Sequence, residues 1–193
     1  MDKEILTAIA LGVGLSASCG FRVFVPMLVA SIAAHLGIFP VQEGFQWLGS
    51  WPAMICFGTA TLFEILAYYI PFVDNLLDGI TTPLAVGAGT LLLTSVLPID
   101  NNMLKWLTGF IIGGGVAATV QGGSVLTRLA STNLTAGAGN PIVATGEHAA
   151  AFGTSLLSLA VPFAVATFLL LLIVFILFKF RKKLLRIKSN PSQ

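Results

Sequence analysis

Two arginines lie inside stretches of small and apolar residues. Arg22 is in "GLSASCGFRVF" (14–24), and Arg128 follows "QGGSVLT" (121–127). A guanidinium costs at least about 2.5 kcal/mol at the centre of a bilayer, so it usually faces protein or a wet cavity. A helix break at nearby glycines would free backbone N–H groups, which attract an anion together with the arginine. The expected breaks and the polar residue beside them are Gly20 in the first stretch, and Gln121, Gly122 and Gly123 in the second.

Acidic side chains occur in similar surroundings and roughly balance the arginines. They are Glu64, Asp74, Asp78 and Glu147, the last followed by His148, which is the better placed histidine for titration. Pro71 is expected to end a helix, and the two aspartates after it are four residues apart, so they share one face of the next helix. They can bind a cation, share a proton, pair with the arginines, or cap a helix at an interface. These alternatives stay open.

Two interpretations of the arginines do not exclude each other. In one, Arg22 or Arg128 pairs with Glu64, Asp78 or Glu147 and holds helices together, as intramembrane charges commonly do. In the other, the arginines line a pathway and contact an anionic substrate or a lipid head group. The aspartates are then their partners or proton or cation sites, and Glu64 is a buried partner.

The composition indicates that a membrane surrounds these residues. Hydrophobic residues make up 56% of the 193-residue chain and charged residues only 9%, with a mean hydropathy of +0.93. Soluble domains carry roughly 25% charged residues. Basic residues concentrate in a tail at 179–193. By the positive-inside rule we expect this tail in the cytoplasm and the protein in the inner membrane.

Five apolar stretches come near the roughly 20 residues that a spanning helix needs. They are 5–37, 51–70, 80–98, 104–131 and 148–178. The sequence therefore predicts an all-α, polytopic membrane protein with five to seven crossings in a single domain, residues 1–178. The segment 132–148 is expected to be a loop that is exposed or folds back as a lid.

The two interrupted stretches resemble each other. "ALGVGLSASCGFRVFVPMLVAS" and "IIGGGVAATVQGGSVLTRLAST" both carry a Gly-x-Gly, small residues, a glycine-containing break and an apolar run with an arginine. Such repeats build many transport folds. We expect related halves at about 5–70 and 104–178, joined by a linker helix at 80–98. If each interrupted segment crosses the membrane once, the two halves are inverted. If each crosses twice or forms a re-entrant hairpin, the halves are parallel. If the first segment is a helical pair and the second a hairpin or a single span, the chain crosses six times.

Catalytic chemistry has little support in the sequence. No Ser-His-Asp, zinc-binding or phosphate-loop motif is found, and no strand precedes the Gly-x-Gly patterns, so we expect no enzyme, cofactor or metal. Cys19 and Cys56 are expected to be small core residues, and His35 to be interfacial. The tail is expected to anchor the protein and not to bind nucleic acid.

The chain resembles a bacterial family of small multi-pass membrane proteins catalogued as domain of unknown function four-one-two-six. The resemblance runs from about residue 5 to about 175, and its most specific parts are Gly20 with Arg22, "PFVDNLLD" (71–78) and Arg128 followed by Asn140-Pro141. Members often have charged residues where this chain has Tyr68-Tyr69, Thr82 and His148. The resemblance implies a membrane fold and no activity.

The residues favour a membrane transporter or channel for a small polar or anionic solute. Broken helices leave backbone groups unpaired, and these are tolerated only where protein or water can satisfy them. The alternative is a non-transporting membrane module that binds lipid or a partner protein and assembles through Gly-rich helix faces, with a homo-oligomer as one outcome. A polar cavity between the interrupted segments would favour transport, whereas dry packing with every charge paired would favour assembly.

Overall fold

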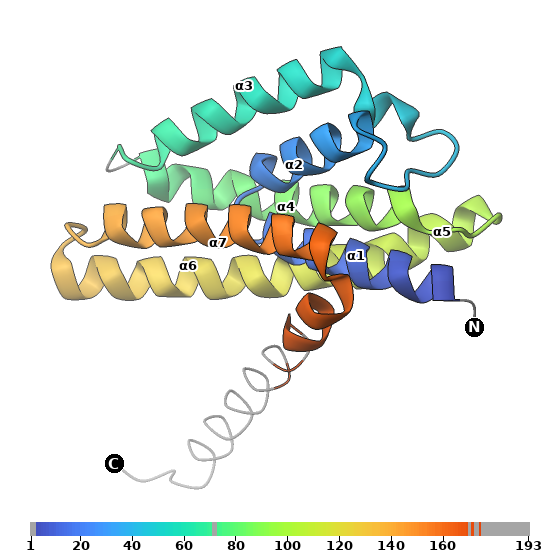
Figure 1. Ribbon diagram of the computed structural model, residues 1–193. Coiled ribbons are helices and arrows are strands. Elements are labelled where there is room, and N and C mark those ends of the chain that lie inside the picture. The colour runs from blue at the N-terminus through green and yellow to red at the C-terminus, as the bar shows by residue number, and fades with distance from the viewer. Residues whose placement is uncertain (1–2, 71–72, 170, 172–173, 175–193) are drawn as a thin grey trace, which may run out of the picture.

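The chain folds into a bundle of helices (Figure 1). A computed structural model describes residues 3–70, 73–169, 171 and 174, with the side chains of 74–76 and 78 not described. No strand occurs among these residues. The helices are α1 (Lys3–Cys19), α2 (Phe24–His35), α3 (Trp51–Ala67), α4 (Val73–Val96), α5 (Asn102–Thr108), α6 (Gly115–Thr135) and α7 (Asn140–Ala160), with a 3₁₀-helix η1 (Gln46–Gly49) and a π-helical turn η2 (Gly109–Gly114).

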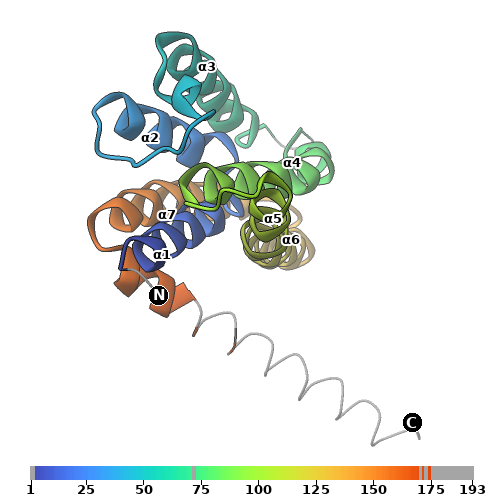
Figure 2. The ribbon, with the colours of Figure 1, turned by 90° about the vertical axis from the view of Figure 1, so that its right-hand side faces the viewer.

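Helix α1 occupies the centre of the bundle. It packs against α4, α6 and α7, and Figure 2 shows it among them. Most residues from Ala8 to Cys19 are buried on every side of the helix, and many are small: Gly12, Gly14, Ser16, Ala17 and Ser18. Small side chains let helix backbones approach closely, which favours helix association in lipid. The Ser16 hydroxyl also donates a hydrogen bond of 2.7 Å to the Gly89 carbonyl in α4.

The first interrupted stretch forms a helical hairpin. Helix α1 ends at Cys19 and α2 begins at Phe24, so the chain leaves the helix at Gly20 and turns back within the bundle (Figure 1). A Cβ atom on Gly20 would lie 2.6 Å from the Ala117 carbonyl oxygen and 2.8 Å from the Gln121 backbone nitrogen, both in α6. Glycine is therefore required where the hairpin tip, residues 20–23, touches α6.

The second stretch is a continuous helix, and the expectation of a break at Gly122 and Gly123 is wrong. Residues Asn102–Thr135 run through α5, η2 and α6 without leaving the helix, although η2 has π-helical geometry. In apolar surroundings a backbone N–H finds its acceptor most readily in its own helix, so glycine alone does not end a helix there. The two stretches that resemble each other in sequence thus fold differently.

Apart from the hairpin tip, the connections between helices lie near two opposite ends of the molecule. At one end lie the start of α1, the loop 36–50 and the end of α4, linked by a hydrogen bond of 2.8 Å from the Gln42 N–H to the Ser95 carbonyl. At the other end α6 turns into α7 through residues 136–139, where Ala136 and Gly137 have positive φ angles of 51° and 88°. The prediction of a loop at 132–148 is therefore wrong, because residues 132–135 and 140–148 are helical.

The surface is apolar while many polar side chains are buried. Exposed large residues include Ile55, Leu62 and Phe63 on α3, Phe110 and Ile111 in η2, and Leu126 and Leu129 on α6. Fully buried hydroxyl side chains include those of Ser16, Ser31, Thr94, Ser155 and Ser158. Among the described residues, two helical spans, Gly79–Val96 and Asn102–Thr135, are long and apolar enough to cross a membrane.

The two cysteines differ in their exposure. Cys19 is buried as expected, but Cys56 is exposed on the outer face of α3, so its assignment to the core is wrong. An apolar segment indicates a lipid-facing position as readily as a core position. The basic tail at 179–193 and the break at Pro71 lie outside the described residues.

Replacing Gly20 tests the contact of the hairpin tip with α6. We expect Gly20→Ala to lower the unfolding free energy by about 1–3 kcal/mol, because the new methyl group meets α6 backbone atoms that cannot move aside. Thermal unfolding of the purified protein, followed by circular dichroism, measures the change. The matched control is Gly58→Ala, whose Cβ meets only Leu28, at 3.8 Å. That control should leave stability unchanged or raise it; equal effects of the two substitutions would contradict the assignment.

Candidate functional site: a buried arginine cluster

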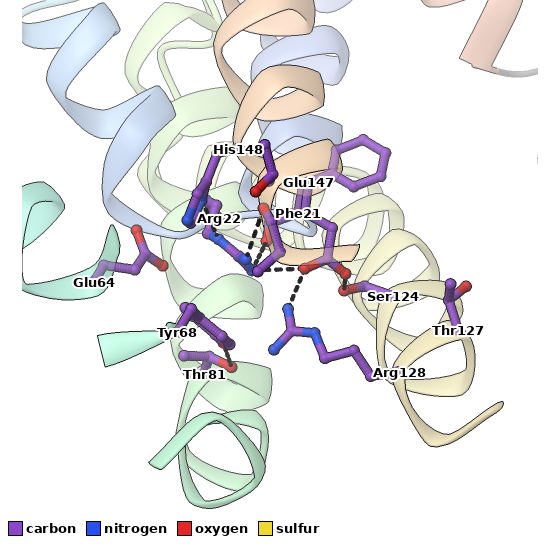
Figure 3. A network of polar contacts seen from close by, with 12 residues as sticks. Phe21, Arg22, Glu64, Tyr68, Thr81, Ser124, Thr127, Arg128, Glu147 and His148 are labelled. Atoms are coloured by element: carbon purple, nitrogen blue, oxygen red, sulfur yellow. Dashed lines mark hydrogen bonds and ion pairs between the residues drawn. The ribbon is translucent and has the colours of Figure 1, made fainter. Parts of the chain in front are cut away.

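Arg22 lies at the hairpin tip, and its side chain is wholly buried in the centre of a polar cluster (Figure 3). Its Nε donates to Nδ1 of His148 at 2.7 Å, and its Nη1 lies 2.9 Å from Oε2 of Glu147. Nη1 also donates to the Phe21 carbonyl at 2.9 Å, and Nη2 donates to the Ala144 carbonyl at 3.3 Å. These bonds connect the hairpin tip to α7.

One carboxylate binds both arginines. Oε2 of Glu147 forms an ion pair with Nη1 of Arg22 and accepts a hydrogen bond from Nη2 of Arg128, and Oε1 accepts one from the Ser124 hydroxyl. Ser124 and Arg128 are on α6, so Glu147 joins α6 to α7 as well as to the tip. Both arginines therefore meet at one oxygen atom of Glu147.

Tyr68, directly after α3, lies against both guanidinium groups. The Cζ atoms of Arg22 and Arg128 lie 3.7 Å and 4.1 Å from its ring centroid, which is cation–π geometry. Its hydroxyl is 3.2 Å from the Thr81 hydroxyl, which accepts a hydrogen bond of 3.1 Å from Nε2 of Gln121. The cluster thereby also connects α3, α4 and α6.

Glu64 binds the hairpin tip from another side. Its Oε1 accepts from the Val23 N–H at 2.7 Å and its Oε2 from the Phe24 N–H at 3.0 Å. These N–H groups stand at the start of α2, where no carbonyl of the same helix can accept them and where the helix dipole attracts negative charge. The anion that binds the N–H groups of this helix break is thus the Glu64 side chain of the protein itself.

His148 has one engaged and one unengaged ring nitrogen. Because Nδ1 accepts from Arg22, the proton of the neutral ring is assigned to Nε2. Nε2 is buried and makes no hydrogen bond within the described structure; the ring interacts with the Ile65 carbonyl without reaching hydrogen-bond geometry. The rings of Tyr68 and Tyr69 lie 6.4 Å and 5.6 Å from it, centroid to centroid.

A cavity of about 430 Å³ lies between α6 and α7, beside the cluster. Glu147 and Ser124 form part of its wall, so the carboxylate separates the arginines from the cavity. Phe21 of the tip and Leu169 also line it. The remaining lining is mostly small or apolar and includes Val120, Gly123, Val143, Gly146 and Ala150. The cavity therefore suits an apolar body next to a charged wall.

The structure brings most of the predicted site residues together. Arg22, Arg128, Glu64, Gln121, Glu147 and His148 all belong to the cluster or its first neighbours. The backbones of Asp74 and Asp78 lie in the first turns of α4, but their side chains are outside the described residues. Sequence reasoning missed Tyr68 and Ser124. Their signal was helical spacing, because each lies four residues from a predicted charge, Glu64 and Arg128 respectively.

Among the described residues, no group of three or more His, Cys, Asp or Glu side chains comes close enough to hold a metal ion. The cluster is instead a guanidinium-rich site shaped around a carboxylate. An arrangement of this kind can bind an anion.

Fold and cluster together define an all-helical protein with spans long and apolar enough to cross a membrane and a charged network in its core. The chain belongs to the family described as domain of unknown function (DUF4126), whose model matches residues 9–182. This match confirms the family resemblance seen in the sequence. No curated protein and no solved structure matches the chain.

Removal of the Glu64 carboxylate tests the cap on α2. Glu64→Ala leaves two buried N–H groups without acceptors, and we expect a loss of roughly 1–3 kcal/mol in unfolding free energy for each group. Glu64→Gln keeps one acceptor oxygen and should lose about half as much. Denaturant titration of both variants measures the difference. Stability equal to the wild type in both would show that the cap contributes nothing.

A double-mutant cycle tests the shared carboxylate. Glu147→Gln removes the anion that two buried cations share and should destabilise by about 3–5 kcal/mol. Adding Arg128→Gln restores the original charge balance, so the double variant should recover a large part of that loss. Additive losses in the same denaturant titration would show that the two residues do not interact.

Proposed function

We propose that this protein is an integral membrane transporter or channel for a small anionic or polar solute, with the cluster of Arg22, Arg128 and Glu147 as its binding site. The supporting observation is that two buried guanidinium groups share one carboxylate at the wall of a cavity. Buried guanidinium groups attract anions, and a neighbouring cavity gives an anion space to approach.

The membrane location is part of this proposal. We place α3, α4, α6 and α7 across the bilayer, with the α1–α2 hairpin entering from the end where the chain starts. The apolar surface and the buried hydroxyl and charged side chains support a lipid environment. The concentration of basic residues in 179–193 supports an inner-membrane protein with a cytoplasmic tail. The two related halves remain a prediction from the sequence. The different folds of the two similar stretches do not support it.

The paired charges support a resting state in which the solute is absent. Glu147 takes the position of an anion between the arginines, and Glu64 takes the corresponding position at the N–H groups of α2. A transported anion then enters by replacing a carboxylate, which keeps the guanidinium groups neutralised at each stage. Asp74 and Asp78, at the start of α4, are proposed as cation or proton sites near one end of this path.

The alternative is a non-transporting membrane module that binds lipid or a partner protein, with or without forming a homo-oligomer. One observation favours it: the cavity between α6 and α7 is lined mostly by apolar and small residues, which suit a lipid chain. The hairpin tip also packs directly on α6 at Gly20, as dry assembly requires.

Flux into proteoliposomes tests transport. We expect the reconstituted protein to accelerate uptake of one or more anions from a panel of chloride, nitrate, bicarbonate, phosphate and octanoate above the rate of protein-free liposomes, and not uptake of sodium or potassium. The charge-balanced variant Arg128→Gln/Glu147→Gln should lose at least about tenfold of that flux, because hydrogen bonds to charged groups contribute about 1.5–3 kcal/mol. Cys56→Ala, exposed on α3, is the matched control and should transport as the wild type does.

The outcomes separate the two functions. Absence of flux with every solute, together with a lipid that co-purifies in fixed ratio, would favour the binding module. Flux that survives in the double variant would reject the arginine cluster as the site.

A further inference from the structure

We infer that the anion recognised by this protein is a monocarboxylate with an apolar body, a substrate class that rests on the transport function proposed above. Two features of the structure meet at one wall and carry the inference. On one side of Glu147 lies a binding slot for a carboxylate, and on the other lies an apolar cavity.

The slot binds two oxygen atoms of one anionic group. Glu147 presents Oε2 to Arg22 and Arg128 and Oε1 to Ser124. A ligand that replaces this group needs one oxygen for the two guanidinium groups and a second oxygen for the hydroxyl. A halide has no second acceptor atom, whereas a carboxylate supplies both oxygens.

The cavity determines what is attached to that carboxylate. Its volume is about 430 Å³, and its walls include Phe21, Val120, Val143 and Leu169. Apolar walls cannot replace the water around a polar body, so a hydroxylated or multiply charged acid is disfavoured. An alkyl or aromatic body gains by leaving water, with an affinity increase of roughly fourfold for each buried methylene.

When the ligand carboxylate replaces that of Glu147 in the slot, one proton passes from the ligand to Glu147. The ligand enters the cavity as the neutral acid and transfers its proton to Glu147, so that R–COOH and the Glu147 carboxylate become R–COO⁻ and the neutral Glu147 acid. The new carboxylate then binds the arginines, and the site keeps the same net charge. This exchange never leaves two buried guanidinium groups without an anion, which would be costly.

Glu147 has both the position and the space for this exchange. It lines the cavity, and Gly123 and Gly146 leave room beside it, since a Cβ atom on either would meet nothing within 4 Å. The Nδ1 atom of His148 is engaged by Arg22, so it does not compete for the proton. Among the described side chains, the charged and titratable groups around Glu147 are Arg22 at the tip, Arg128 on α6, His148 on α7, and Tyr68 and Glu64 on the α3 side.

Binding of octanoate to the full-length protein in lipid nanodiscs tests the inference, with isothermal titration calorimetry as the readout and empty nanodiscs as the blank. Octanoate is ionised in solution between about pH 6 and 8, so the bound state takes up one proton. Wild-type affinity should therefore fall about tenfold for each unit of rising pH. In Glu147→Gln no proton is taken up, and octanoate should bind more tightly and independently of pH.

A pair of adjacent glycines provides the control for the cavity. Gly122 and Gly123 are both in α6, and neither would place a Cβ within 4 Å of another atom, but only Gly123 lines the cavity. Gly123→Leu should weaken octanoate binding at least about tenfold, equal to 1.4 kcal/mol, whereas Gly122→Leu should bind as the wild type does. 1-Octanol, which has the same chain without the carboxylate, should bind at least about tenfold more weakly than octanoate.

Three results would overturn the inference: equal binding by the two leucine variants, 1-octanol binding as tightly as octanoate, or octanoate binding by Glu147→Gln alone with none by the wild type. The last result would show that Glu147 is a permanent part of the cluster. The failure of the transport proposal looks different. Anion flux without octanoate binding rejects only the substrate class, and pH-dependent octanoate binding without any flux rejects only transport.

Discussion

The structure depends on the need to neutralise a guanidinium that is wholly buried. Arg22 sits where two helices meet, and neither water nor a neighbouring turn of helix can satisfy it. Glu147 supplies the charge, while the carbonyls of Phe21 and Ala144 and the ring of His148 take the remaining hydrogen bonds. Because these partners come from the tip and α7, the position of the hairpin is determined by this one side chain.

The hairpin tip shows how a helix break is stabilised inside a protein. A break leaves N–H groups at the start of one helix and carbonyl groups at the end of the other, with opposite partial charges. Glu64 binds the N–H groups of α2. The positive end of α2 is thus matched by a charge of the opposite sign that belongs to the chain. The same position is one at which a bound anion would be stabilised.

Much of the cluster was predictable, whereas the partners within it were not. Arg22, Arg128, Glu64 and Glu147 stand out in an apolar sequence because each is costly in lipid, so their convergence follows from polarity alone. The choice of Glu147 over Glu64 as the partner of both arginines depends on how α7 packs against the tip, which no local pattern encodes. The break at Gly20 could not be read from glycine alone, because Gly122 stays helical and so does Gly12, which contacts its neighbours as closely as Gly20 does. Glycine by itself therefore carried less information than its surroundings.

The π-helical turn η2 has a consequence for the direction in which α6 displays its polar side chains. A single π turn accommodates one extra residue, and one residue rotates everything after it by about 100° around the helix axis. Gln121, Ser124 and Arg128, which follow this turn, face the core together. In a helix of uniform pitch, the same residues would point about a quarter of a revolution away, and the arginine would meet hydrocarbon. A short run of glycine-rich backbone thus sets the angular phase of a charge that lies several turns away from it.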